Sequence, residues 1–294
     1  MTQAFSGDRG GPAALRMQVG ARLRRYRIAR QVSREDAGWH IRASDSKISR
    51  MELGRVPFKE RDVADLLTFY GVEGGERQDL LELVRRANAP AWWQSQADVV
   101  PPWFTSYLGL EQAASMIRTY DLHFVPALLQ TPDYTRALLE ISCSASPEEL
   151  DRRVSLRQAR QHVLRGANPT VLWAAVDEAV LHRELGSPAV MRRQLEVLAE
   201  ASRALNVRLH IGSFPVDALA TAGLSFTLLR FAEPDLPDTV FVEQPAGATY
   251  VDRPIEVEQY TLALDRACAA AAPPSRAASV IESLTRGHSE FVQP

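Results

Sequence analysis

Residues 32–55 read VSREDAGWHIRASDSKISRMELGR, and the fold of the first part of the chain is decided here. Ser33 and Ser44 are each suited to cap the start of a helix, because a serine hydroxyl accepts a hydrogen bond from the first helical turn. Gly54 is placed to end the second helix. The spacing therefore predicts two short helices separated by about three residues.

Two short helices this close together fit a helix-turn-helix arrangement, in which the helices cross at a steep angle. The crossing needs small residues in the first helix, and Ala37 and Gly38 provide them. Ile41, Ile48 and Met51 can then fill the wedge between the helices. The first turn of the second helix faces outward, which is the surface that a major groove of DNA would meet.

Helical periodicity continues on both sides of this stretch. Apolar residues recur at spacings of three and four from residue 15 to 31 and from residue 63 to 84. Residues 1–14 have no periodicity and are expected to form a flexible tail. We therefore expect an all-α domain over residues 15–87.

The chain has 294 residues and a formal net charge of -2 at pH 7, but its parts differ in sign. Residues 16–61 hold 13 basic and 5 acidic residues, a net charge of +8. The remaining 21 basic and 31 acidic residues give -10, which restores the total of -2. The local excess indicates an anionic partner for the front segment. On charge alone, a solvated basic surface is the alternative.

The second part of the chain predicts a different fold class. A connector rich in proline and tryptophan spans residues 88–102, and residues 103–294 mix helical and strand patterns. We expect strands at residues 171–176, 207–211, 225–231, 239–243 and 248–251, the last two as a hairpin. We expect helices to start at Thr131-Pro132, Ser146-Pro147 and Ser187-Pro188, the third with an apolar stripe of Met191, Leu195, Leu198 and Leu205, and two closing helices around Pro273-Pro274. The whole is a multidomain chain, all-α and then mixed α/β.

Sequence motifs for catalysis are missing. The chain has no nucleophile elbow, phosphate-binding loop, dinucleotide fingerprint or zinc-protease motif, and its six histidines include no pair at metal-ligand spacing. Cys143 and Cys268 are too few for a disulfide framework. We expect no enzymatic activity, metal or cofactor. The apolar runs are too short for a membrane span or a signal peptide, so we expect a cytoplasmic protein.

Residues 15–72 resemble the lambda-repressor-like (XRE-type) helix-turn-helix family through VSRED at 32–36 and SDSKISRMELGR at 44–55. The resemblance implies that Arg34 and Ser44 contact phosphates, that Asp45, Ser46 and Arg50 lie where the family reads bases, and that Arg55 reaches the backbone. Asp45 could instead only cap its helix, and Arg50 could contact a phosphate or solvent. The candidate DNA contacts are Arg34, Ser44, Asp45, Ser46, Lys47, Ser49, Arg50 and Arg55.

Two further features follow from this resemblance. Arg27 and Glu52 match the family's buried ion pair, a structural role whose loss is expected to cost about 3 to 5 kcal/mol. Arg42 stands at the turn position where the family favours glycine. Because non-glycine residues seldom adopt a positive φ, we expect the turn to be rebuilt here.

Residues 103–290 resemble the C-terminal domain of WhiJ-type (Scr1-type) antitoxin-like actinobacterial regulators. The matching motifs are VPALLQTPDY at 125–134, RQARQ at 157–161, DEAVL at 177–181, MRRQL at 191–195, FTLL at 226–229 and VFVE at 240–243. The resemblance implies a small BldB-like protein partner. Arg157, Arg160 and Gln161 form a helical face that could bind an anion or the partner, or could simply be solvated.

Three hypotheses follow. The main one is a homodimeric, sequence-specific transcription regulator, a repressor of developmental or secondary-metabolite genes that binds a palindromic operator on double-stranded DNA. Its second domain would dimerise and receive a protein or small-molecule signal. The second is an antitoxin-like protein that sequesters a small BldB-like partner and binds DNA for autoregulation. The third, an enzyme domain under a DNA-binding module, has no motif in its favour.

Overall fold

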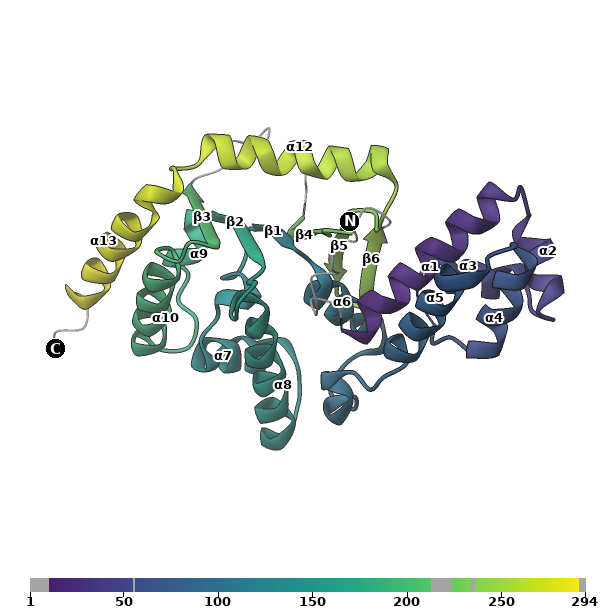
Figure 1. Cartoon of the computed structure of the whole chain (residues 1–294). Coiled ribbons are helices and arrows are strands. Elements are labelled where there is room, and N and C mark those ends of the chain that lie inside the picture. The colour runs from purple at the N-terminus through teal and green to yellow at the C-terminus, as the bar shows by residue number, and fades with distance from the viewer. Residues whose placement is uncertain (1–10, 55, 213–223, 234–235, 291–294) are drawn as a thin grey trace. The chain divides into compact units, whose positions relative to one another are not determined.

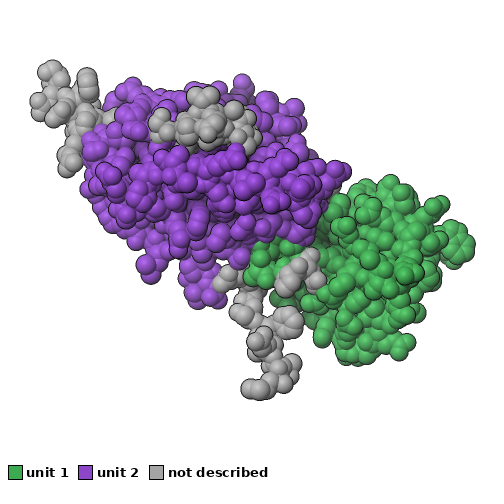
Figure 2. Space-filling model, turned by 90° about the horizontal axis from the view of Figure 1, so that it is seen from above, with its two compact units in different colours: residues 1–95, 105–113, 231–236 green, residues 96–104, 114–230, 237–294 purple. Residues whose placement is uncertain are grey.

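The computed structural model describes residues 11–54, 56–212, 224–233 and 236–290. The chain forms two compact units, residues 1–95 with 105–113 and 231–236, and residues 96–104 with 114–230 and 237–294 (Figure 2). The expected fold class is confirmed, because helices make up the first part and a sheet with helices the second. None of the described helices combines the length and the apolar character that a membrane crossing requires.

Helices build the first unit in the order that the sequence predicts (Figure 1). They are α1 (Pro12–Ala29), α2 (Arg34–His40), α3 (Asp45–Glu52), α4 (Glu60–Phe69) and α5 (Gly74–Ala87). Both predicted caps form, since the Ser33 hydroxyl accepts from the Asp36 amide at 3.0 Å and the Ser44 hydroxyl from the Lys47 amide at 3.2 Å. Helix α1 begins at Pro12, so the last three residues of the expected tail (12–14) are helical, whereas residues 1–10 lie outside the described residues.

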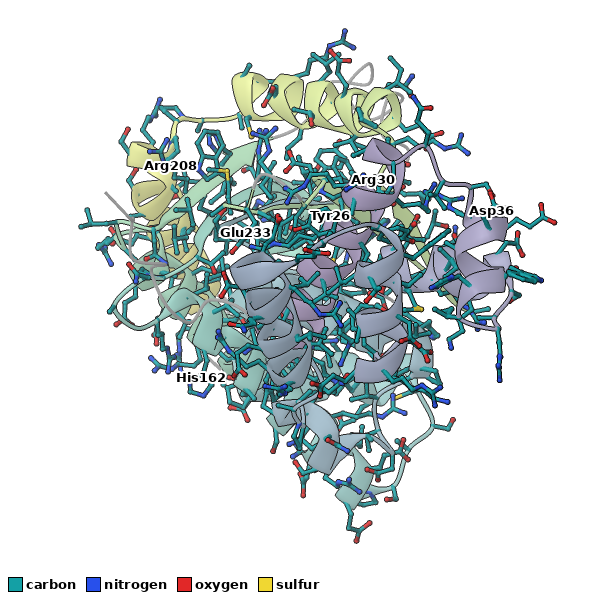
Figure 3. The ribbon with its side chains drawn as sticks, turned by 45° about the vertical axis from the view of Figure 1, so that its right-hand side comes forward. Tyr26, Arg30, Asp36, His162, Arg208 and Glu233 are labelled. Carbon is teal, nitrogen blue, oxygen red and sulfur yellow. The ribbon has the colours of Figure 1, made fainter. Side chains whose placement is uncertain are left out.

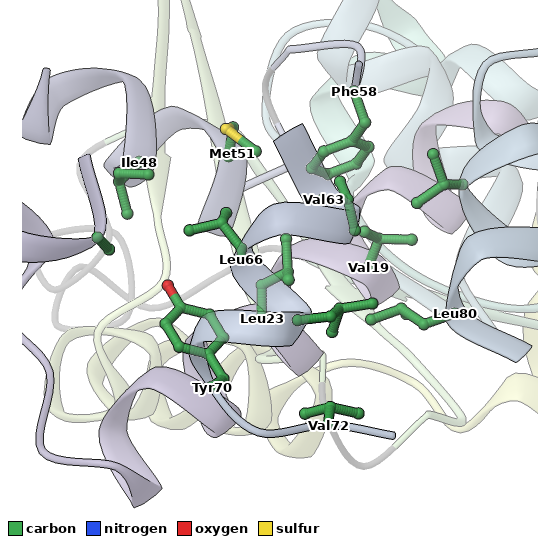
Figure 4. Close-up of a cluster of buried hydrophobic side chains, with 13 residues drawn as sticks. Val19, Leu23, Ile48, Met51, Phe58, Val63, Leu66, Tyr70, Val72 and Leu80 are labelled. Carbon is green, nitrogen blue, oxygen red and sulfur yellow. The ribbon is translucent and has the colours of Figure 1, made fainter. Parts of the chain in front are cut away.

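A single apolar cluster holds these helices together (Figure 4). Ile48 and Met51 of α3 pack into it, and the half-buried Ile41 lies against it, as the wedge between the motif helices requires. Gly38 is buried where α2 meets the next turn, and a Cβ atom there would lie 2.7 Å from the carbonyl oxygen of Ala43. The predicted need for a small residue at this crossing is therefore confirmed.

The turn between α2 and α3 keeps a left-handed residue at its expected position. Arg42 has a φ of 55°, a conformation that L-residues seldom adopt. The expected rebuilding of the turn is therefore wrong. The amide of Ala43 donates to the carbonyl of Gly38 at 2.8 Å, and this hydrogen bond closes the turn and holds Arg42 in its strained backbone conformation.

The second unit is built on one sheet in the order β3-β2-β1-β4-β5-β6. Its strands are β1 (Met116–Asp121), β2 (Val171–Asp177), β3 (Val207–Gly212), β4 (Phe226–Arg230), β5 (Thr239–Gln244) and β6 (Gly247–Val251). β1, β2 and β3 run parallel, whereas β4, β5 and β6 join by antiparallel pairing. The predicted hairpin is the β5–β6 pair, and β1 is a strand that the sequence patterns missed.

Helices cover this sheet on both sides (Figure 1). Helix α12 (Pro254–Ala270) runs across the strands, and its Val257, Leu264 and Ala267 pack on the apolar side chains of one face. On the other side lie α7 (Pro132–Ser142), α8 (Pro147–Arg160) and α10 (Pro188–Ala201), each with the Ser/Thr-Pro start that the sequence predicts. The remaining helices of this unit are α9 (Glu178–His182) and α13 (Ala277–Glu290). Most of α6 (Pro102–Ala113) belongs to the first unit, which includes residues 105–113.

Two expectations for this part differ from the structure. Helix α10 ends at Ala201, so Leu205 lies beyond it and is 103% exposed instead of continuing the apolar stripe. The connector expected at residues 88–102 contains a short 3-10 helix at Trp92–Gln96, in which Trp93 is buried. The first boundary between the two units falls between residues 95 and 96, within this stretch.

Candidate nucleic-acid interface

Helix α3 has one buried and one outward side. Ile48, Met51 and Glu52 are buried, whereas Asp45, Ser46 and Arg50 are exposed. This division follows from the helical period, since residues 46 and 50 lie one turn apart on the side away from the core. The first turn of α3 and Arg50 therefore form a continuous polar strip.

Hydroxyl groups at the start of α3 have hydrogen-bonding capacity to spare. Ser44 is exposed and uses its oxygen to accept from the Lys47 amide, which leaves its proton for an acceptor such as a phosphate. The Ser46 hydroxyl donates to the Asp45 carboxylate at 3.4 Å. The Arg50 Nε donates to the Ser46 carbonyl at 3.3 Å, so the guanidinium lies back along its own helix.

Other predicted contacts differ in their availability. Lys47 is half-buried, and its Nζ lies 2.5 Å from the Asp62 Oδ2 of α4, which neutralises its charge within the domain. Ser49 is half-buried as well. Arg55 lies outside the described residues. The outward strip therefore consists of the first turn of α3 and Arg50, without Lys47.

An ion-pair network fixes α3 to its neighbours. The Arg27 Nε lies 2.5 Å from Glu52 Oε1, its Nη2 donates to Glu52 Oε2 at 3.0 Å, and its Nη1 donates to the Val32 carbonyl at 2.8 Å. The Arg27 and Glu52 side chains are only 11% and 4% exposed. Burial, and then the charge of Glu52, raises the pKa of the neighbouring Tyr70. One arginine thus ties α1, the loop before α2 and the end of α3.

Arg34 joins the same network from the outside. Its Nε lies 3.3 Å from Glu52 Oε2, while its side chain remains 45% exposed at the first position of α2. Asp36 (labelled in Figure 3) is exposed in the same turn and accepts from the Ser33 hydroxyl at 2.6 Å. Arg34 is therefore held in place at a helix start where its remaining N–H groups face solvent.

Arg42 is an exposed cation that the sequence reasoning did not count as a DNA contact. Its side chain has no hydrogen bond or ion pair with any residue that the structure describes. It lies in the turn between Arg34 on α2 and Ser44 before α3. Its basic charge in the turn of the motif was the signal that could have identified it.

The helical face predicted at residues 157–161 is used within the domain. Arg157 donates to the side-chain oxygen of Gln130 at 2.8 Å, and Gln161 donates to the Gln130 carbonyl at 2.7 Å. Arg160 is buried, with its guanidinium carbon 5.1 Å from the centre of the Phe104 ring. These side chains hold the segment before α7 in place, so we do not place a ligand or partner on them.

A buried glutamine completes this arrangement from α10. The Gln194 side chain accepts from the Thr131 amide at 2.7 Å and donates to the Leu129 carbonyl at 2.8 Å. Three sequence motifs that lie far apart in the chain, residues 125–134, 157–161 and 191–195, thus meet in one polar network around Gln130. Their shared role is structural, because each contact satisfies a buried backbone or side-chain group.

Comparison with known families gives a separate match for the helical first part of the chain and for the part that contains the sheet. Residues 18–80 match the family described as a helix-turn-helix domain, which contains α2, α3 and the strip. Residues 104–283, more than half of the chain, match the family described as a domain of unknown function (DUF5753). The chain belongs to the DUF5753 family. Comparison with curated proteins and with solved structures finds no match.

The helix-turn-helix match of this DUF5753 protein indicates a DNA-binding regulator. In the DUF5753 part, the described residues contain no group of three or more His, Cys, Asp or Glu side chains that could hold a metal ion. The helix-turn-helix match itself covers α2, α3 and the turn between them.

Proposed function

We propose that this DUF5753 protein is a sequence-specific transcription regulator that lays α3 in the major groove and represses developmental or secondary-metabolite genes. The observation that carries the proposal is the outward strip of α3, which starts at Ser44 and ends at Arg50. Arg34 and Arg42 flank it with exposed positive charge. In this proposal the chain has no enzymatic activity.

The chemistry of the strip suits base edges. Arg50 can donate two hydrogen bonds to guanine, and Asp45 can accept one from the cytosine amino group. Ser46 can donate or accept with any base. The flanking arginines would neutralise phosphates, which supplies affinity without sequence preference. Arg50 must leave the Ser46 carbonyl to reach a base, and an exposed arginine does so readily.

We also propose that the protein acts as a homodimer on a palindromic operator. One helix-turn-helix reads only a few base pairs, so two copies related by a two-fold axis are needed to select one site. The DUF5753 part would mediate this pairing and receive a signal from a small molecule or from a small BldB-like protein. Size-exclusion chromatography with light scattering should give the mass of a dimer, and a monomer at micromolar concentration would contradict the pairing.

Fluorescence anisotropy tests the DNA proposal directly. The full chain is titrated against labelled DNA from its own upstream region and against random DNA at the same salt concentration. We expect nanomolar affinity for the first and affinity at least 1,000-fold weaker for the second, as is typical of specific regulators. Equal affinity for both would reject the proposal.

A pair of variants locates the site. Arg50→Ala should weaken binding to the upstream DNA by about 1 to 3 kcal/mol and leave binding to random DNA nearly unchanged. Arg86→Ala is the matched control, because it removes the same charge from an exposed position in the last turn of α5. If both variants weaken binding equally, the effect is one of net charge and α3 does not read bases through Arg50.

A further inference from the structure

One face of the sheet carries a row of charged and aromatic side chains across its parallel strands. Arg118 on β1 is in register with Trp173 on β2, and Trp173 is in register with Arg208 on β3 (labelled in Figure 3). His210 follows two residues after Arg208 and lies on the same face. Asp265 of α12 reaches this face, since it accepts from Arg118 Nη2 at 2.5 Å.

The two guanidinium groups lie on either side of the indole of Trp173. Their central carbons are 5.0 Å (Arg118) and 4.9 Å (Arg208) from the centre of the indole. Because β1 and β3 flank β2, the indole lies between the two cations. The His210 ring is centred 6.2 Å from the indole. All four side chains therefore gather around one indole on this face of the sheet.

Polar atoms of this row are buried without a partner. The Nε of Arg118, the Nε1 of Trp173 and the Nδ1 of His210 make no hydrogen bond within the part of the chain that the structure describes. Arg118 itself is only 4% exposed. A buried donor without an acceptor lowers stability by about 1 to 3 kcal/mol, so we expect these donors to bind an acceptor from outside the chain.

The charges around these atoms favour an anion. Asp265 balances one of the two arginines, and Arg208 has no carboxylate partner among the described residues. Burial, and then the charges of Arg118 and Arg208, lower the pKa of His210, which favours the neutral form of its imidazole. A hydrogen bond to the backbone of Cys268 uses one ring nitrogen, and the unpartnered Nδ1 is left as an acceptor.

We propose that Arg118, Trp173, Arg208 and His210 form a binding site for a small oxyanion that carries a hydroxyl group. Its carboxylate or phosphate oxygens accept from the arginines and the indole N–H, and its hydroxyl donates to His210 Nδ1. Strand β3 is at the edge of the sheet and Arg208 is exposed, so the ligand enters past this side chain. This site is independent of the proposal that the protein binds DNA.

Nuclear magnetic resonance of the full chain with ¹⁵N-labelled indoles tests the site. The chain has five tryptophans, and Trp173→Phe identifies the signal of Trp173. Lactate, inorganic phosphate and acetate are titrated to 50 mM (about fifty-fold above a millimolar Kd), each against sodium chloride of equal ionic strength. We expect a saturable shift of the Trp173 N–H with lactate or phosphate, and a weaker response to acetate, which has no hydroxyl.

Each outcome decides the proposal. Saturation by lactate alone identifies a hydroxy acid as the ligand class, and saturation by phosphate alone identifies a phosphate. No saturable shift with any of the three, or equal shifts of all indole signals, overturns the site. Arg208→Gln should weaken ligand binding about tenfold, and the variant is expected to fold because Arg208 is exposed. Arg193→Gln, on α10, is the control and should leave ligand binding unchanged. Unchanged binding by the Arg208 variant also overturns the site.

Discussion

Gly38 shows at the scale of a single residue how the motif depends on backbone proximity. A Cβ atom at this position would lie 2.7 Å from the Ala43 carbonyl oxygen and 3.1 Å from the Ser44 carbonyl carbon. Both atoms belong to the backbone of the turn, so neither can rotate away. The close approach of α2 to the start of α3 therefore leaves no room for a methyl group.

Gly38→Ala should destabilise the protein. Overpacking a tight site costs about 1 to 3 kcal/mol, which exceeds the gain of up to about 1 kcal/mol that alanine brings to a helix. Urea unfolding at equilibrium measures the difference. Gly75→Ala in the first turn of α5 is the control, because nothing lies within 4 Å of its Cβ position, and it should be neutral or slightly stabilising. Equal effects of the two variants would contradict the tight crossing.

The roles of some single residues could be predicted from the sequence, and those of others could not. The serine caps and Gly38 act through neighbours a few positions away, so their roles could be predicted from spacing. The role of Lys47 could not be predicted in this way, since its charge is neutralised by Asp62 on another helix. The same holds for Arg157, whose partner Gln130 lies 27 positions away in the chain. Whether a charged side chain is available for a ligand depends on contacts that only the fold creates.

At the scale of elements, the turn between α2 and α3 combines strain with function. Arg42 holds a φ of 55°, which costs a non-glycine residue about 1 to 3 kcal/mol. Its exposed charge lies between the two helices of the interface. The strained arginine is thus explained if its side chain contributes to DNA binding, as the proposed function requires.

Arg42→Gly should separate these two effects. Glycine relieves the strain, so the free energy of unfolding should rise by about 1 kcal/mol, offset in part by the greater freedom of glycine in the unfolded chain. DNA binding should weaken at the same time. The slope of log affinity against log salt concentration should become shallower by about 1, because one phosphate contact is lost. Arg42→Lys keeps the charge and should retain most of the binding. If Arg42→Gly binds DNA as tightly as the original chain, Arg42 is not a contact.

Strand β1 shows why one element escaped prediction. A central strand normally reads as a continuous apolar run. Residues 116–121 read MIRTYD, in which Arg118 and Thr119 are buried polar residues. Arg118 is accommodated there by its ion pair with Asp265 on α12, a contact that no local pattern encodes. The other five strands, with ordinary β-branched and aromatic runs, lie close to their predicted positions.

Asp121 at the end of β1 should give the protein a pH-dependent stability. Burial raises the pKa of its carboxyl from 3.8 to about 7. The unfolded chain therefore loses this proton near pH 4 and the folded chain near pH 7. Between these values the folded state binds more protons, so stability falls as the pH rises, by roughly 2 to 3 kcal/mol from pH 5 to pH 8.

Asp121→Asn isolates this contribution, because a carboxamide does not titrate. Urea unfolding of both proteins at pH 5, 6, 7 and 8 gives two stability curves. We expect the difference in unfolding free energy between the two proteins to change by roughly 2 to 3 kcal/mol from pH 5 to pH 8 and to level off beyond pH 7. Parallel curves would show that the carboxyl group is ionised in the folded protein throughout this range.

At the scale of the whole molecule, charge is divided along the chain. Residues 16–61 carry +8 and the rest carries -10. An acidic remainder repels DNA, so it restricts binding to the basic segment. The phosphate contacts proposed for one copy are Arg34, Arg42 and Arg55, with Ser44 as a neutral donor. A single copy therefore neutralises only about three phosphates, too few for tight binding at physiological salt.

The salt dependence of DNA binding should therefore report the number of copies on the operator. The logarithm of the affinity falls with the logarithm of salt concentration with a slope of about -0.9 per neutralised phosphate. Two copies with about three contacts each give a slope near -5, and one copy gives a slope near -3. Anisotropy titrations of the full chain from 50 to 300 mM potassium chloride, a range over which charged contacts weaken measurably, distinguish the two values. A slope near -3 on a palindromic site would mean that one copy binds alone, and the two-fold arrangement would then be wrong.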